Sequence, residues 1–289
     1  MNHSEGYFKG RQGTNLYYQG WLPEGPPVAV LLIVHGLAEH SGRYGNVVNY
    51  FVPRGYAVYG IDHPGHGHSD GPRAYLERFQ DFLDPLQVFL GRIRDWQPET
   101  PIFLVGHSMG GLISAAYLLD QPDELAGAIL SAPSVKMPGS VSTLTLLAGK
   151  VLSALLPKMG LVRLEADGVS RDPAVVRAYR SDPLVFTGKI TARLGTELLQ
   201  AMDRVLAEAP KIRTPLLILQ GAADKLVDPQ GAQVLFDRVG STDKAIKVYE
   251  GLYHEVFNEP EHDRVLGDVE KWLAGQLETR VSAAGREVY

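Results

Sequence analysis

Cysteine is absent from the 289-residue sequence. This absence excludes disulfide bridges, thiolate metal ligands and a cysteine nucleophile. The sequence also has no lysine- or arginine-rich run, and its formal net charge is −5. A mildly acidic surface repels phosphate backbones, so we expect no nucleic-acid partner.

Long hydrophobic segments are lacking as well. The longest apolar stretch, residues 141–156, is interrupted by polar side chains and is too short to span a bilayer. The N-terminal segment has no basic region followed by an apolar one, so no signal peptide is visible. We therefore expect a cytoplasmic protein that is at most peripheral at membranes.

Short apolar runs alternate with helical patterns along the chain. This alternation predicts an α/β fold with a mostly parallel central sheet and helices on both faces. Two further runs, residues 7–9 and 16–22, predict an antiparallel hairpin at the sheet edge. The runs expected as parallel strands are 28–36, 56–62, 101–108, 125–133, 215–224 and 244–251, and the expected helices are 76–96, 110–119, 229–238 and 262–277.

The alternation is interrupted between residues 134 and 210, where the pattern is helical without strands. A parallel crossover needs only about a dozen residues, so we expect a helical insertion at 134–210 within a core of residues 1–133 and 211–289. Leu147 and Val151 lie at helical spacing on its apolar face. Two interpretations stay open: a helix packed on the core, or a lid in which these two residues face an apolar substrate.

The segment Gly106-His107-Ser108-Met109-Gly110 follows an expected strand and precedes an expected helix. It matches the G-x-S-x-G elbow, which exposes a serine hydroxyl on a sharp turn. A tight strand-to-helix corner would favour glycines even without any chemistry. The remaining members of a catalytic set are needed to separate the two interpretations.

A serine hydroxyl is a weak nucleophile until a base takes its proton and a third group orients that base. Asp224 and His254 each follow an expected strand and give the order Ser, Asp, His along the chain. Asp228 also follows the same strand as Asp224. It precedes Pro229 and a helical run, which is typical of a helix N-cap, so we assign the acid to Asp224.

Acyl transfer also requires hydrogen-bond donors for the developing oxyanion. The segment HGLAEHSGRY forms a turn after the first parallel strand, and it offers the backbone N–H of Leu37. Met109, directly after the serine, offers the second N–H.

Five segments together resemble the monoacylglycerol lipase and lysophospholipase branch of the α/β-hydrolases, over nearly the whole chain. They are HGLAEHSGRY, DHPGHGHSDGPR, GHSMGG, YRSDPL and GAADKLVD with YEGLYHE. The resemblance implies the triad Ser108, Asp224 and His254, with Leu37 and Met109 as oxyanion donors. Ala38 stands where several relatives have glycine.

By the same resemblance, four polar side chains help to hold the glycerol end of the substrate: Glu39, Arg43, His107 and Tyr179. Plainer roles stay open for them: Glu39 and Arg43 as an i, i+4 pair on an exposed helix, and Tyr179 as an ordinary buried aromatic. His63, His66 and His68 lie in one glycine-rich loop, but no thiolate or carboxylate set completes a zinc site around them, so we expect no metal.

The sequence thus predicts a serine hydrolase that cleaves carboxylic esters of monoacylglycerol type through an acyl-enzyme and without a cofactor. Lysophospholipase or broad carboxylesterase activity is the alternative among enzymes. A non-catalytic ligand-binding protein that keeps the pocket is the alternative outside enzymes. The expected partner is a small lipid ester, with transient contact of the lid with a membrane surface, and the oligomeric state is left open.

Overall fold

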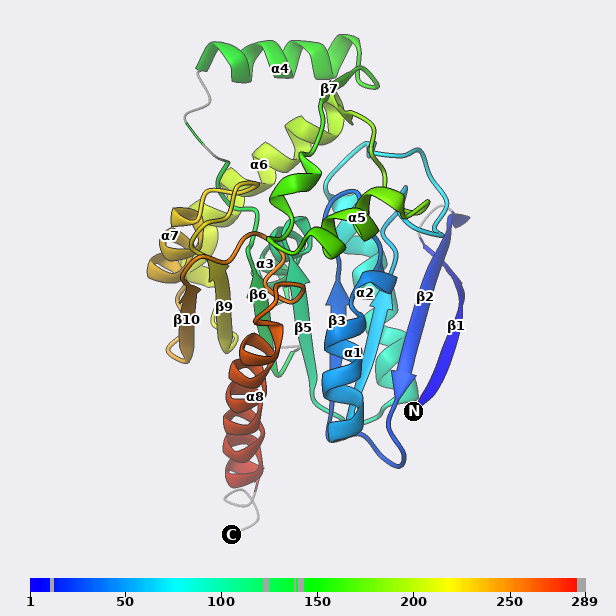
Figure 1. Ribbon diagram of the computed structural model, residues 1–289, viewed down its shortest axis with the longest axis vertical. Helices are drawn as coiled ribbons and strands as arrows, with labels where there is room; N and C mark the ends of the chain where they lie inside the picture. Colours follow the sequence, from blue (N-terminus) through cyan, green and yellow to red (C-terminus); the bar gives the residue numbers. More distant parts are fainter. Residues whose placement is uncertain (11–12, 122–124, 138, 140–142, 285–289) are drawn as a thin grey trace.

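The computed structural model describes residues 1–10, 13–121, 125–137, 139 and 143–284, apart from the side chains of residues 143–148, 283 and 284. An eight-stranded sheet crosses the molecule in the order β1-β2-β4-β3-β5-β6-β9-β10 (Figure 1). The six strands from β4 to β10 run parallel, while β1 and β2 form an antiparallel hairpin at the edge. The expected sheet and its edge hairpin are therefore confirmed. The strands are β1 (Asn2–Lys9), β2 (Asn15–Leu22), β3 (Ala29–Val34), β4 (Tyr56–Ile61), β5 (Ile102–His107), β6 (Gly127–Ser131), β9 (Leu216–Gly221) and β10 (Lys244–Tyr249).

Helices cover both faces of the sheet, which explains why its central strands are buried at every position and are mostly apolar. In β3, Leu32 packs into the core under α2 (Gln80–Trp96), α3 (Met109–Asp120) and α7 (Gln230–Arg238). The neighbouring Leu31 packs into the opposite core under α1 (Gly45–Phe51) and α8 (His262–Ala284). Successive side chains of a strand point to opposite faces, so one apolar run supplies both cores. The short helix α1 was not expected from the sequence.

The chain between β6 and β9 builds a separate set of elements. Figure 1 places α4 (Thr143–Leu155) at the top of the molecule, away from the sheet, and α4 contacts α6 (Ala192–Glu208). Helix α5 (Pro173–Ser181) lies between them in the sequence. The expectation of helices without strands was wrong, because β7 (Gly160–Val162) and β8 (Ile190–Thr191) pair antiparallel. Strands this short leave no alternating pattern in the sequence.

None of the helices in the described ranges has the length and apolar character needed to cross a bilayer.

Candidate active site

Ser108 occupies a strained turn between β5 and α3. Its φ of 55° and ψ of −118° lie outside the regions that non-glycine residues favour. The flanking glycines are required by close approach: a Cβ on Gly110 would lie 1.8 Å from the carbonyl oxygen of Val34, and one on Gly106 would lie 2.4 Å from Oγ of Ser114. A plain corner would place glycine at the strained position, whereas here the serine carries the positive φ, as an exposed nucleophile requires.

Asp224 and His254 are in contact at the ends of β9 and β10. Nδ1 of His254 lies 2.7 Å from Oδ2 of Asp224. The carboxylate also accepts hydrogen bonds from the Gln220 amide at 3.0 Å and from the backbone N–H groups of Leu226 and Val227. Burial favours the neutral acid, but His254 and these donors hold the pKa of Asp224 below its ordinary value. A charged Asp224 fixes the imidazole through Nδ1, and Nε2 of His254 makes no hydrogen bond within the described part of the chain.

Asp228 has a different environment from Asp224. Its carboxylate accepts the backbone N–H of Gln230, the first residue of α7, at 3.0 Å, and forms an ion pair with Lys136 at 2.7 Å. The hydrogen bond to Lys136 holds the pKa of Asp228 below its ordinary value. The prediction of Asp228 as the N-cap of α7 was wrong by one residue, because the N-cap is Pro229; Asp228 precedes it and still accepts the first N–H of the helix.

Both candidate oxyanion donors line one cavity with the serine and the histidine. Leu37 belongs to the turn after β3, and Met109 is the first residue of α3. Neither backbone N–H donates a hydrogen bond to another residue in the described part of the chain. Backbone donors that lack protein acceptors in such a cavity are the kind of group that an oxyanion hole requires.

A buried ion network lies beside this cavity. Arg43 donates to Oε2 of Glu39 at 2.8 Å and makes a two-pronged contact with Glu255 at 2.7 and 2.8 Å. Oε1 of Glu39 accepts the N–H of Gly36 at 2.6 Å and the hydroxyl of Tyr44 at 2.8 Å. Burial opposes both charges, yet each partner stabilises the other: the pKa of Arg43 is raised and that of Glu255 is lowered. Glu39 and Arg43 are therefore not an exposed helical pair.

Glu255 is the residue of this network that sequence reasoning missed. It directly follows His254, and its side chain is almost fully buried. The signal in the sequence is a charged residue next to the expected base, in a loop whose other residues are mainly apolar.

The cavity has a volume of about 420 Å³. The part of the wall formed by Glu39, His107 and Glu255 is termed its polar end. Most of the remaining wall is apolar and comes from the segment between β6 and β9, which also contributes Lys150, Gln200 and Asp203. His107 is neutral, because burial and the adjacent His254 lower its pKa to about 4. The apolar wall of described residues includes Leu161, Val162, Leu164, Val169, Ile190, Leu198, Leu199 and Met202.

Comparison with known proteins places this arrangement in a family. The family profile described as serine aminopeptidase, S33, matches residues 25–261. The chain belongs to this hydrolase family.

Individual relatives of this chain carry more specific names than the family profile. A monoacylglycerol lipase of Mycolicibacterium smegmatis is 40% identical over 274 residues, which cover 95% of this chain and 98% of the relative. A monoglyceride lipase of Mus musculus is 39% identical, covering 94% and 90%. The crystal structure of the Paleococcus ferrophilus monoacylglycerol lipase superposes with a TM-score of 0.82 at 32% identity, covering 90% and 99%. These relatives confirm the α/β-hydrolase fold and support an ester hydrolase function.

The candidate substrate-binding residues differ in whether they line the cavity. Glu39, His107 and Tyr179 line the cavity. Arg43 lies behind them, 4.6 Å from the centre of the Tyr179 ring, and it is not part of the cavity wall. Val151 is 49% exposed and is also absent from the wall. The side chain of Leu147 lies outside the described residues.

The histidines of the glycine-rich loop have structural partners. His63 is fully buried, its backbone N–H donates to Nε2 of His35 at 2.9 Å, and burial lowers its pKa to about 3. His66 is also buried, and its Nδ1 contacts the carbonyl of Pro64. Within the described ranges, no group of three or more histidine, aspartate or glutamate side chains is arranged to hold a metal ion.

Proposed function

We propose that this protein hydrolyses the ester bond of monoacylglycerols to a fatty acid and glycerol. The observation that carries the proposal is that His254, hydrogen-bonded to the charged Asp224, lines one largely apolar cavity together with the strained Ser108. A polar end beside an apolar wall suits a substrate with free hydroxyls at one end and an acyl chain at the other.

In the proposed mechanism, Oγ of Ser108 attacks the ester carbonyl carbon while Nε2 of His254 accepts the hydroxyl proton. The carbonyl π electrons move to the oxygen, which the N–H groups of Leu37 and Met109 stabilise. The intermediate then expels glycerol, whose oxygen takes the proton from His254, and an acyl-serine remains. Water attacks this ester with His254 again as base, and the acid and free Ser108 are released.

Head-group selection is proposed to come from Glu39, His107 and Tyr179 at the polar end of the cavity. Arg43 then acts indirectly, by holding Glu39 and Glu255 as charged acceptors. A site whose buried polar groups bond a substrate hydroxyl strongly rejects a substrate that lacks this hydroxyl, because those groups are then left unpaired. Esters without free glycerol hydroxyls should therefore react poorly.

A panel of mono-, di- and triacylglycerols and lysophospholipids of one acyl chain tests the substrate class. We expect the highest kcat/KM for monoacylglycerol. Equal kcat/KM on mono- and triacylglycerol would contradict the assignment, and a maximum on lysophospholipid or on simple esters would favour the alternative enzyme classes. Failure of a fluorophosphonate to label Ser108 would instead indicate a ligand-binding protein without catalysis.

We also propose that residues 134–210 form a cap that touches membrane surfaces transiently. In support, Leu155 and Leu156 at the end of α4 are 73% and 54% exposed, and Val162 is 62% exposed. Cosedimentation with phosphatidylcholine vesicles should weaken in a Leu155→Ser, Leu156→Ser variant. Val281→Ser is the matched control, because that valine is 74% exposed on α8. Equal vesicle binding by both variants would contradict the cap as the contact site.

A further inference from the structure

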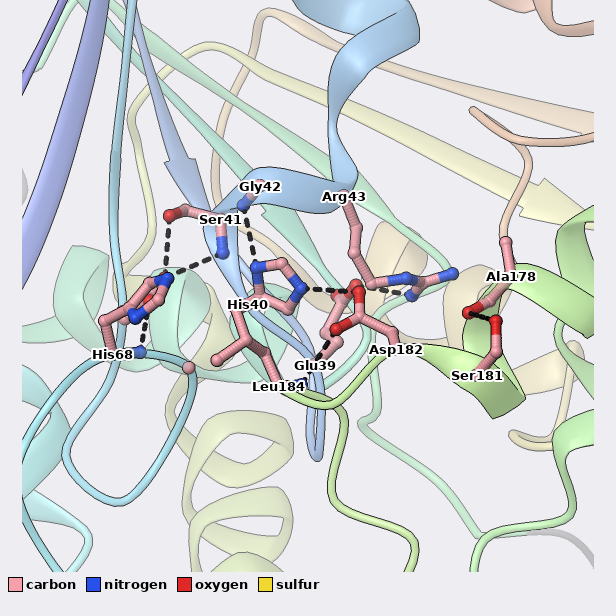
Figure 2. A network of polar contacts seen from close by, with 12 residues as sticks. Glu39, His40, Ser41, Gly42, Arg43, His68, Ala178, Ser181, Asp182 and Leu184 are labelled. Carbon is pink, nitrogen blue, oxygen red and sulfur yellow. Dashed lines mark hydrogen bonds and ion pairs between the residues drawn. The ribbon is translucent and has the colours of Figure 1, made fainter.

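Two hydrogen bonds join the turn that carries Leu37 to the segment that follows α5. The carbonyl oxygen of Ala38 accepts the N–H of Phe186 at 2.8 Å. Two residues further along the turn, Nε2 of His40 lies 2.9 Å from Oδ2 of Asp182 (Figure 2). Both contacts connect the core to the proposed cap, across more than 140 positions of sequence.

The hydrogen bonds of His40 indicate its tautomer. Nδ1 of His40 accepts the backbone N–H of Gly42 at 3.2 Å, so the ring proton resides on Nε2, which donates to Asp182 (Figure 2). The other carboxylate oxygen of Asp182 accepts the N–H of Leu184 at 2.8 Å. Burial opposes ionisation, but the bonds from His40 and Leu184 hold the pKa of Asp182 below its ordinary value. Asp182 is thus a charged acceptor that ties the ring to the cap.

The turn held by these contacts is strained. Ala38 has a φ of 68°, in the left-handed region that favours glycine. A residue keeps such a conformation only when its surroundings over-determine it. From the core side, Glu39 holds the N–H of Gly36; from the cap side, Asp182 and Phe186 hold His40 and Ala38. The candidate donor Leu37 lies between these two sets of anchors.

We propose that Asp182 is a positioning residue for the oxyanion turn: through His40 it keeps the N–H of Leu37 aimed at the developing oxyanion. This inference rests on the proposed hydrolase function. It gives the cap a role in the chemical step in addition to lining the cavity. The reason is that an oxyanion donor contributes only when it is already in place before charge develops.

Steady-state kinetics of Asp182→Ala on a monoacylglycerol test this role. Outright loss of one oxyanion donor costs about 100- to 1000-fold in kcat, so a displaced donor should cost less, about tenfold, with KM changed less than twofold. Asp182→Asn keeps one acceptor oxygen, so its kcat should lie between that of the wild type and that of Asp182→Ala. Asp167→Ala is the matched control, since Asp167 pairs at an exposed site with Arg180 of α5, two residues before Asp182; its kcat should equal that of the wild type.

A double-mutant cycle separates this coupling from general destabilisation. If Asp182 acts through His40, then the His40→Ala, Asp182→Ala double variant loses no more kcat than the more damaging single variant. If the kcat losses of the two single variants multiply in the double variant, the coupling is overturned. Retained kcat with a raised KM in Asp182→Ala would also overturn it, because Asp182 would then only shape the pocket.

A trifluoromethyl ketone of the acyl chain reports directly on the oxyanion turn. Oγ of Ser108 adds to the ketone carbon, its proton passes to His254, and the carbonyl π electrons become a lone pair on the oxyanion. In Asp182→Ala, the inhibition constant of this ketone should rise by the factor by which kcat/KM falls, while the Kd of an unreactive ether analogue stays constant.

If the inhibition constant of the ketone is unchanged in Asp182→Ala and the wild type hydrolyses the ester, the inference is overturned but the proposed function stands. Absence of turnover and of ketone inhibition in the wild type would overturn the proposed function, and this inference with it.

Discussion

Oδ2 of Asp224 and Nδ1 of His254 lie 2.7 Å apart although 30 positions separate them in the sequence. The two residues follow β9 and β10, which are neighbouring parallel strands. Because parallel strands end at the same edge of a sheet, the loops after them meet. This contact distinguishes Asp224 from Asp228, which accepts the first N–H of α7 and pairs with Lys136.

Asp224→Asn should lower kcat about 10⁴-fold, because an amide misorients the imidazole and no longer supports its cation. Asp228→Ala should leave turnover nearly unchanged and cost about 1 kcal/mol of unfolding free energy through the lost cap. Ester kinetics and urea unfolding of both variants check the pair. An inactive Asp228 variant beside an active Asp224→Asn would reverse the assignment of the acid.

Ser108→Ala should lower ester turnover roughly a million-fold with the fold intact, because nucleophile and base act as one unit. Fluorophosphonate labelling should disappear in the same variant. Ser134→Ala provides the control, since Ser134 lines the same cavity and donates its backbone N–H, which the substitution keeps, to the carbonyl oxygen of Ser108. Residual turnover above about one per cent in Ser108→Ala would contradict its role as nucleophile.

Leu199→Ala should reduce kcat/KM for long-chain esters about tenfold and affect acetyl esters little, because Leu199 of α6 lines the apolar wall. Val151→Ser should leave both unchanged, since Val151 lies outside the wall and is half exposed. A chain-length series of p-nitrophenyl esters measures both effects. A larger long-chain loss in Val151→Ser than in Leu199→Ala would show that Val151 faces the acyl chain after all.

Arg43→Met should destabilise the protein by roughly 3 to 5 kcal/mol at pH 7, because Glu39 and Glu255 would stay buried without a cation. The folded pKa of Glu255 lies below its ordinary value of 4.5. Its ionised form therefore contributes stability above pH 4.5, and this contribution is lost as the pH falls through the folded pKa. The difference between wild type and variant should accordingly shrink on acidification.

Urea unfolding at pH 7 and pH 4 measures this dependence on the Glu255 carboxyl. Arg180→Met is the control, since the Arg180–Asp167 pair is exposed and should contribute less than about 1 kcal/mol. A destabilisation by Arg43→Met that is equal at both pH values would contradict the ionic interpretation of the network.

The strands, their mostly parallel arrangement and the place of the chemistry were largely predictable from local sequence. Continuous apolar runs such as that of β3 identify strands buried on both faces, because each face of the sheet has its own core. Gly106 and Gly110 identify the turn at Ser108, because a side chain at either position would collide with neighbouring atoms. Asp224 and His254 follow from their places after two expected strands.

The tertiary structure alone decided which side chains of the site contact one another. Glu255 and Arg43, 212 positions apart, meet as a buried pair, and Asp182 reaches His40 from the segment after α5. Tertiary packing also left Val151 outside the cavity wall, although its spacing placed it on an apolar helix face. Periodicity records which face of an element is apolar; what that face packs against depends on distant chain segments, whose approach leaves no mark in the local sequence.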